Sequence, residues 1–453
     1  MLAYRRNEVS AVTPESLSLL NIVSHAPFDV MTESEPTSQQ PSASQSVSRQ
    51  QASQRLMLAM IGLAAVVAVG AAVRNQWKSP PEPIGDSPSV SRLPEGVTRE
   101  QYHHAAGMYY QQFGREPNRE ETLMMLGEHL VQTDQPATAI ACFEQIPTDH
   151  ASYGASARLQ QAQLYLRLDQ AAQAEDHFRQ FLNLVESPEG RQSPLATPLH
   201  IGTARRWLVY LMAVELRFEE RHQILQRMIR DEQFDVYEAK QYYFPTLLIW
   251  HSSLGSGRVD QFLQHDATNP RLLLAKARYL LEGDDVDSAQ ELLDSLSSEF
   301  PEDLSIRAAQ IKCHYEQGNS DAMGEILAAM PTYSESEPWL LTRMRAEYAA
   351  EVARWDEAEG FYRLILEKIP ADPGSHAGLA RVLSKLERSE ECDVLQQRSL
   401  LLAKIRVDLP AVNNESPDGA RRLAEQSRAL GMEDAARSFE QLAQQIETSL
   451  QER

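Results

Sequence analysis

The sequence predicts an all-α protein made of stacked helix hairpins, preceded by one transmembrane helix and a disordered tail. Three observations support this prediction. Residues 56–73 form an uncharged apolar stretch, the apolar residues after Thr98 recur with helical spacing, and small residues return there every 34 or 35 positions. No stretch of this region alternates strictly between apolar and polar residues over six positions, as a half-buried strand would.

Residues 1–55 are expected to form a disordered tail. Residues 32–54 contain seven Ser and six Gln and no aromatic residue, so they cannot bury enough apolar surface to offset the entropy of ordering. Residues 74–97 are expected to form a stiff, extended linker, because five prolines fall between positions 80 and 94.

Residues 56–73 are expected to cross a membrane as a single uncleaved helix. These 18 residues would span about 27 Å, which is close to the thickness of a bilayer core. Arg55 and Arg74 bound the stretch, and Trp77 and Lys78 suit the interface. A buried core helix and a cleaved signal peptide are the alternatives. We expect a single-pass protein of a bacterial inner membrane. Two basic residues lie on each side, so we favour a cytoplasmic N-terminus only by analogy with ordinary signal anchors.

The charge of the chain argues against nucleic acid as a partner. The 453 residues include 43 Lys and Arg and 64 Asp and Glu, a net charge of -21. All of the excess acid follows residue 78, where 37 basic residues face 59 acidic ones. Non-specific binding of nucleic acid needs basic residues that neutralise phosphates, so this class of function is excluded.

A repeated unit is visible in the spacing of small residues. Pairs of small residues lie twelve positions apart, with large apolar residues three and four positions beyond each pair. The pairs are Gly127 and Ala139, Ala162 and Ala174, Ala277 and Ala289, Ala346 and Ala358, Ala380 and Cys392, and Ala424 and Ala436. Small residues at such positions let two helices approach closely. We count nine helix pairs between residues 118 and 450, and the polar helix near 433–450 would cap the stack.

This pattern resembles the tetratricopeptide repeat (TPR) family, whose unit is a hairpin of two antiparallel helices. The segment from Trp355 to Glu359, with Tyr362 and Pro370, is similar to the family's second helix. The resemblance implies a right-handed α-solenoid, divided here into repeats at 98–268 and 269–453. It is clear over 118–185 and 269–392. Residues 201–266 are degenerate, because they lack the small pair and contain Pro245.

We find no motif that would support catalysis, a cofactor or a metal. The chain has no phosphate-binding GxxxxGK[ST] loop and no CxxCH haem motif, and its three cysteines share no metal-ligand spacing. The prediction is therefore a protein that is not an enzyme. One alternative is an unrecognised site in 201–266, where aromatic residues could line a pocket, although core packing is the favoured interpretation. These residues are Trp207, Tyr210, Tyr242, Tyr243 and Trp250.

The TPR resemblance implies a concave groove lined by the first helix of each hairpin. Carrying over the family's groove positions gives a basic row in an acidic protein, with apolar residues between the charges. The predicted groove residues are Arg271, Leu274, Arg278, Lys312, Tyr315, Leu340, Arg343 and Arg381. They predict a protein partner with an acidic or C-terminal carboxylate segment. The alternative is a set of solvated surface charges.

These features together predict a membrane-anchored TPR scaffold that mediates protein–protein interactions at a bacterial cell envelope. A second hypothesis is a structural or assembly factor of an envelope complex that acts through its outer faces. Exposed apolar residues on the second helices would favour the second hypothesis, and a ligand in the groove would favour the first.

Overall fold

The computed structural model describes residues 93–247 and 252–451. Helices, turns and irregular segments make up this part, and it contains no strand. The predicted tail, the predicted transmembrane segment and most of the predicted linker lie outside it. Among the residues that are described, no helix combines the length and the apolar character that a membrane crossing needs. The expected all-α architecture is confirmed for the part described.

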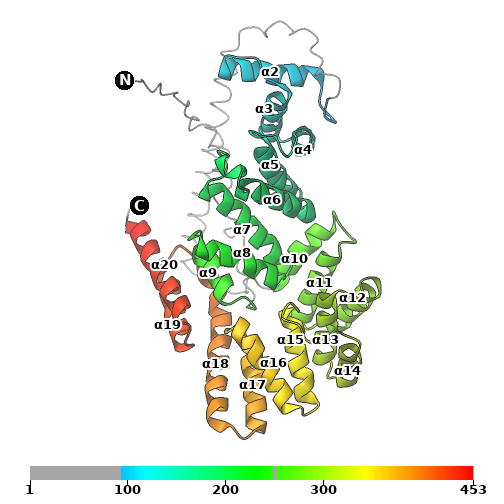
Figure 1. Ribbon diagram of the computed structural model, residues 1–453, viewed down its shortest axis with the longest axis vertical. Coiled ribbons are helices and arrows are strands. Elements are labelled where there is room, and N and C mark those ends of the chain that lie inside the picture. The colour runs from blue at the N-terminus through cyan, green and yellow to red at the C-terminus, as the bar shows by residue number, and fades with distance from the viewer. Residues whose placement is uncertain (1–92, 248–251, 452–453) are drawn as a thin grey trace, which may run out of the picture. The chain divides into compact units, whose positions relative to one another are not determined.

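The helices follow one another in the order shown in Figure 1. Their bounds are α2 Arg99–Phe113, α3 Arg119–Gln132, α4 Pro136–Glu144, α5 Gly154–Arg167, α6 Ala171–Glu186, α7 Pro198–Val214, α8 Phe218–Arg230, α9 Val236–Tyr243, α10 Ser252–Leu263, α11 Pro270–Glu282, α12 Val286–Glu299, α13 Leu304–Glu316, α14 Ser320–Ala328, α15 Trp339–Glu351, α16 Trp355–Lys368, α17 Pro373–Lys385, α18 Ser389–Asp408, α19 Pro417–Ala429 and α20 Glu433–Gln451. Two short 3₁₀ helices are η5 Gly190–Gln192 and η6 Leu409–Ala411.

One backbone feature recurs between the two helices of eight hairpins. A single residue there has a positive φ, which is the left-handed conformation that ends many helices. These turn residues are Asp134, Asp169, Leu216, Asp284, Gly318, Ala353, Glu387 and Gly431. The N–H of the next residue donates to a carbonyl five positions earlier, as from Arg354 to Ala349 at 2.8 Å. The repeated turn therefore gives these eight hairpins one common geometry. Equivalent positions in different hairpins can be found by counting from the turn residue.

The small residues occupy the same two places in most hairpins, seven positions before the turn residue and five after it. Ala346 and Ala358, on either side of the turn at Ala353, are both fully buried. Two hairpins depart from this rule. Val209 and Arg221 take these places in α7 and α8, and Ile311 and Met323 take them in α13 and α14. The predicted close approach of helices is thus built by six hairpins, and the degenerate one has a buried arginine where an alanine is expected.

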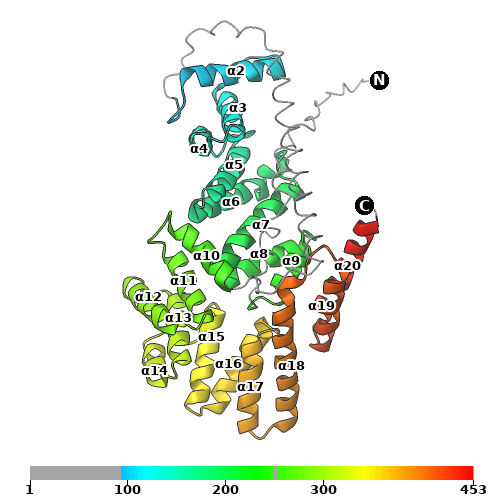
Figure 2. The ribbon, with the colours of Figure 1, turned by 180° about the vertical axis from the view of Figure 1, so that it is seen from behind.

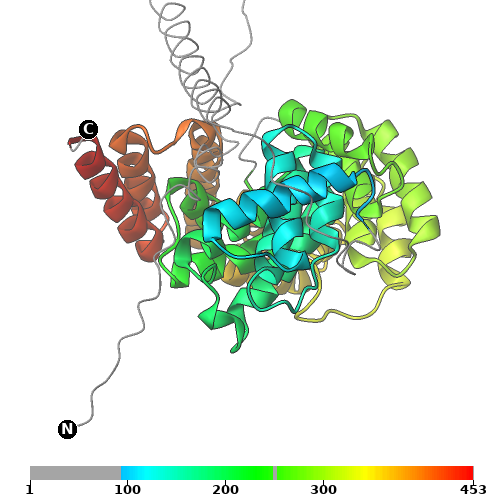
Figure 3. The same cartoon turned by 90° about the horizontal axis from the view of Figure 1, so that it is seen from above.

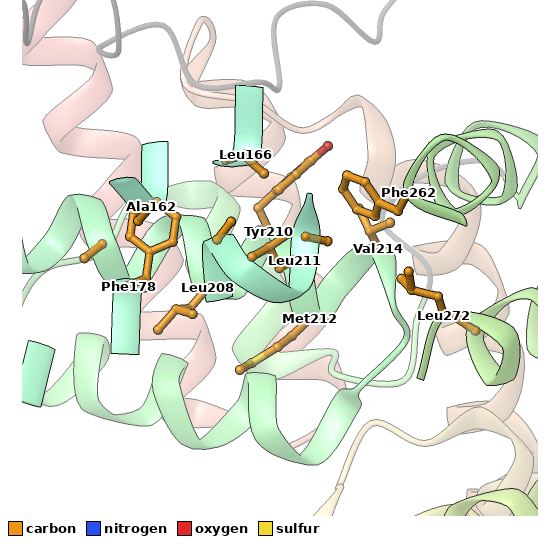
Figure 4. Packing of buried hydrophobic residues seen from close by; sticks show 14 of the residues in the cluster. Ala162, Leu166, Phe178, Leu208, Tyr210, Leu211, Met212, Val214, Phe262 and Leu272 are labelled. Carbon is orange, nitrogen blue, oxygen red and sulfur yellow. The ribbon is translucent and has the colours of Figure 1, made fainter. Parts of the chain in front are cut away.

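The largest hydrophobic cluster lies where the first repeats meet the degenerate region. Figure 4 shows Phe178 of α6, Leu208 and Tyr210 of α7, Phe262 of α10 and Leu272 of α11 packed together. This cluster runs from Leu159 to Tyr279. The packed core is therefore continuous across position 268, where the sequence suggested a division between two sets of repeats.

Helix α9 leaves the regular order of hairpins. It packs against α8 and α20, whereas α10 packs against α11 and α7. Phe244 and Leu247, just after α9, share one buried cluster with Leu402 and Ile405 of α18 and with Phe439 of α20. Figures 2 and 3 show the α19–α20 hairpin to one side of α18, with α20 outermost. The helix expected to cap the stack, α20, packs on α19 and also on α9, which is far from it in the sequence.

A buried lysine ties α9 to the end of α18. The Lys240 ammonium donates to the carbonyls of Val412 at 2.8 Å and Leu409 at 3.3 Å. Both carbonyls belong to the chain that leaves α18, and a charged donor suits carbonyls at the end of a helix. Burial lowers the pKa of Lys240 to about 8. Nearby, Asn414 donates to Asp235 at 2.9 Å and adds a second bond across the same contact.

Candidate functional site

The predicted groove cations lie on the first helices of successive hairpins. Arg278 of α11, Lys312 of α13 and Arg381 of α17 each precede the turn residue by six positions, so they occupy equivalent places. Arg343 lies on α15, the first helix between α13 and α17. All four cations therefore lie on first helices, with Arg278, Lys312 and Arg381 in one register and Arg343 four positions earlier in its hairpin. Whether they bind a partner stays a prediction.

Each of these cations is engaged by the chain itself. Lys312 pairs with Glu282 at 2.7 Å, Arg381 with Glu347 at 2.6 Å and Arg343 with Asp372 at 3.6 Å. Burial alone would raise the pKa of Glu282, but the Lys312 charge holds it below its ordinary value. The basic row is therefore interleaved with carboxylates from neighbouring hairpins. Because each pair joins residues about 30 positions apart, the sequence pattern predicted the cations but not the carboxylates with which they pair.

Arg278 has a different role from the other cations. Its guanidinium donates to the carbonyl of Leu216, the left-handed turn residue between α7 and α8, at 2.8 Å. Burial lowers the pKa of this arginine. Arg278 is thus a contact between the degenerate region and the C-terminal repeats, and it is not an open groove charge.

The apolar groove residues are mostly packed. Leu274 is buried in a cluster with Leu281 and Ala309, so it is not available to a partner in this structure. Tyr315 and Leu340 are half-buried against a neighbouring cluster. Arg271 is exposed and lies 3.6 Å from Glu175. Among the four predicted groove residues that form ion pairs, Arg271 and Arg381 have the most exposed side chains.

The start of α8 contacts the same first helices that were expected to line the groove. The Glu219 carboxylate accepts from the N–H of Trp339, the first residue of α15, at 2.7 Å. Since Pro338 supplies no side-chain cap, Glu219 caps α15 from a distant part of the chain. The ring of His222 stacks on Tyr242 and meets Trp339 edge to face, with centroids 4.7 and 5.4 Å apart. A partner that binds here would have to share this surface with the chain's own residues 216–247, which we call the α8–α9 segment.

Lowering the pH from 7 to 5 is expected to weaken the α8–α9 segment through His222. Burial, with a smaller contribution from the Arg221 charge, lowers the pKa of His222 to about 4. The folded-state pKa lies below the unfolded value near 6.5, so the unfolded chain binds the proton more tightly. Stability is therefore lost as pH falls below 6.5, by roughly 1–2 kcal/mol at pH 5. Urea unfolding of wild type and His222→Phe at both pH values measures this difference.

The Phe variant keeps an aromatic ring beside Tyr242 and should lose less stability between pH 7 and pH 5 than wild type. His265→Gln, which changes an exposed histidine, is the control and should follow wild type. An unchanged pH dependence in His222→Phe would show that this ring does not titrate with folding.

A buried charge cluster braces α6, α7 and α8 and was not anticipated from the sequence. Arg217 donates to Glu175 at 2.6 Å, to Glu215 at 2.9 Å and to Glu220 at 2.6 Å. Burial raises the pKa of Glu215 to about 7, against the opposing effect of Arg217. A carboxyl group with such a pKa is typical of some catalytic acids. Here the carboxylate is already bonded to Arg217, so a structural brace explains it.

The aromatic residues of the degenerate region do not gather around one cavity. Tyr210 is buried in the main cluster and Trp207 packs against it. Tyr242 and Tyr243 lie in the α8–α9 segment, and Trp250 is outside the described residues. A separate cavity of about 340 Å³ lies between α2 and α3 and includes His104 and His129 in its lining. In the described part of the chain, no cluster of His, Cys, Asp and Glu has a metal-binding arrangement.

Comparison with known proteins gives distant structural likeness. No family model and no curated protein matches the sequence. A tetratricopeptide repeat protein from Parabacteroides merdae is 12% identical, with a TM-score of 0.29, over 58% of this chain and 99% of its own. PilW, a type IV pilus biogenesis factor, is 18% identical, with a TM-score of 0.27, over 52% of this chain and 98% of its own. The Cut9–Hcn1 structure is 13% identical, with a TM-score of 0.33, over 77% of this chain and 78% of that chain. The evidence for the hairpin geometry of this chain is its own repeated turns and buried small-residue pairs.

Proposed function

We propose that the chain is a non-catalytic scaffold that binds other proteins and is anchored to a bacterial membrane through residues 56–73. The observation that supports binding is the repeated hairpin itself. Six hairpins each bury a pair of small residues between their two helices, successive hairpins pack on one another, and the remaining faces stay at the surface as long helical rows. Such rows recognise partners by shape and side-chain contact, without any reacting group.

The inner-face cations suggest a partner with an acidic or C-terminal carboxylate segment. Arg381 is paired with Glu347 yet leaves nearly half of its side chain exposed, and Arg271 is more exposed still. A partner carboxylate could therefore share these two guanidinium groups, which each carry several donors. Arg278 and Lys312 are committed to contacts within the chain, so the exposed pair is the better place to test binding.

Co-purification from detergent extracts, followed by mass spectrometry, tests this partner. Changing both Arg271 and Arg381 to Glu should weaken recovery of the partner severalfold and flatten its dependence on salt, because fewer charges take part. Arg421→Glu is the matched control. Arg421 lies on α19 and forms an exposed ion pair with Glu447 of α20, so this variant should leave recovery unchanged. Equal recovery with the double variant would show that the inner-face cations do not bind the partner.

Alkaline carbonate extraction tests the anchor separately. The wild-type chain should stay with the membrane pellet, because an apolar helix is held by its burial in lipid. Val66→Arg places a charge at the middle of the segment and should cost about 3 kcal/mol of insertion. Release of the intact wild-type chain into the supernatant would contradict the proposed anchor without affecting the repeats.

A second candidate function is assembly of a larger complex through the outer faces. One observation favours it specifically. The second helix α18 exposes Leu400 and Val407, the two most exposed large hydrophobic residues in the described chain.

A further inference from the structure

Helix α18 carries an apolar face without a neighbour in the described structure. Leu400 is 73% exposed and Val407 is 79% exposed. They lie seven positions apart, so they point to the same side of the helix, and exposed Ala403 falls between them on that side. Isolated exposed hydrophobic residues need no explanation, but a row along one helix face does.

In three other hairpins the equivalent position of the second helix lies against the hairpin that follows. Leu182, Ser297, Leu366 and Leu400 each lie 13 positions after the turn residue of their own hairpin. Leu182 packs against a cluster that contains Leu208 of the next hairpin. Leu366 likewise packs against a cluster that contains Leu379 of the hairpin after its own. Ser297 accepts a hydrogen bond from Gln310 of α13 at 2.9 Å. Leu400 therefore occupies a place that normally receives the next hairpin.

The next hairpin of this chain does not take that place. After α18 the chain passes through η6, and α19 packs chiefly against α20, which also packs on α9. This hairpin shares a buried cluster with Leu402 and Ile405, which lie on a different side of α18 from Leu400 and Val407. Contact between α18 and α19 is slight. Figures 1 and 2 show α18 at the end of the row that begins with α15, with the α19–α20 hairpin to one side of it near α9. This face of α18 is thus a surface on which a further hairpin would stack, and it is exposed because α19 and α20 pack elsewhere.

The charges around this face are basic, in contrast with the rest of the protein. Lys404 lies between Leu400 and Val407 and makes no ion pair with any residue from 93–247 or 252–451. Residues 396–411 contain Arg398, Lys404 and Arg406 against one acidic residue, Asp408. Arg406 and Asp408 are paired with Glu282 and Arg422. Lys404 remains as the charge that a ligand of this face would meet.

We propose that the α18 face, defined by Leu400, Ala403, Lys404 and Val407, docks an amphipathic helix of a partner protein. That helix would carry apolar residues at three- and four-residue spacing and an acidic residue beside them. Its apolar row would take the place of the missing hairpin, and its carboxylate would pair with Lys404. This inference rests on the proposed scaffold function and names a docking surface for it.

A photoreactive residue at position 400 tests the proposal in the full-length protein. Benzoylphenylalanine replaces Leu400, and irradiation of cells that naturally produce the chain is followed by mass spectrometry of the adduct. The same residue at Val352 is the matched control, because Val352 is an exposed apolar residue beside a hairpin turn and away from α18. We expect an adduct from position 400 and none from position 352. The cross-linked peptide should have the stated apolar and acidic pattern.

Two variants examine the chemistry of the face. Val407→Glu and Lys404→Glu, each combined with the photoreactive residue, should lower the adduct yield at least fivefold. Both side chains are exposed, and circular dichroism should show unchanged helical content. An unaltered yield in both variants would overturn the docking site.

The identity of the adduct separates the remaining outcomes. A second copy of this chain, or its own residues 1–92, attached to position 400 would overturn the proposal of a partner protein. No adduct, while a partner still co-purifies with the chain, would overturn the α18 site and leave the scaffold function intact. No adduct and no co-purified partner would overturn both.

Discussion

Replacing Arg217 with Met is expected to lower the free energy of unfolding by about 3–5 kcal/mol. Arg217 is almost completely buried and holds Glu175, Glu215 and Glu220 in one cluster. Met fills a similar volume but leaves two buried carboxylates without their cation, which is the costly way to break a buried ion pair. Urea unfolding of the purified chain measures the loss. The loss should shrink at pH 5, because the buried carboxyls can then become neutral.

Arg179→Met is the control for this prediction. Arg179 pairs with Glu175 and Glu220 of the same cluster, but its own side chain is largely exposed. An exposed ion pair contributes roughly 0–1 kcal/mol, so this variant should remain close to wild type. Equal losses in the two variants would show that the buried ion pairs of Arg217 contribute no more to stability than the ion pairs of Arg179.

Replacing Ala358 with Leu is expected to cost about 1–3 kcal/mol. Ala358 is fully buried five positions after the turn at Ala353, opposite Ala346 on the paired helix. A larger side chain would push α15 and α16 apart, and the whole stack beyond them would have to adjust. Chemical unfolding followed by circular dichroism measures the change.

Gly360→Ala on the same helix gives the opposite expectation. A Cβ at Gly360 would meet no atom within 4 Å, so the new methyl group fits freely. Alanine favours the helix by about 0.5–1 kcal/mol over glycine, and stability should rise. Tolerance of Ala358→Leu together with this gain would mean that Ala358 is not a close-contact position.

The hairpins were predictable because their signal is local. Alanine or glycine twelve positions apart, as in Ala277 and Ala289, marks two helices that touch within one unit. Helical periodicity predicted nine helix pairs. Among the described helices α3–α20, eight such hairpins form, and α9 and α10 pack on other helices instead of on each other. Where the small pair is missing, as at Val209 and Arg221, the sequence correctly set the region apart. It could not say where the displaced helices go.

The candidate site was less predictable because its contacts join distant parts of the chain. Arg278 has the register of a groove residue, yet its guanidinium binds a carbonyl 62 positions earlier, at Leu216. Lys240 binds carbonyls about 170 positions later, and nothing in the local pattern around it indicates this. The apolar row on α18 was readable as a spacing, but its exposure follows from the path of α19, which only the fold reveals.

The return of the chain's end to α9 is the central claim of this account, because it keeps α19 and α20 off the face of α18 that carries Leu400 and Val407. A pair of cysteines at Asp235 and Asn414, whose side chains are hydrogen-bonded, tests it with a short bifunctional thiol reagent. The native cysteines are buried, so they should react little. The account predicts an efficient cross-link within one chain, and none between positions 235 and 321, since α14 packs only near α13 and α15. Absence of the 235–414 cross-link, or its formation only between chains, would contradict the account.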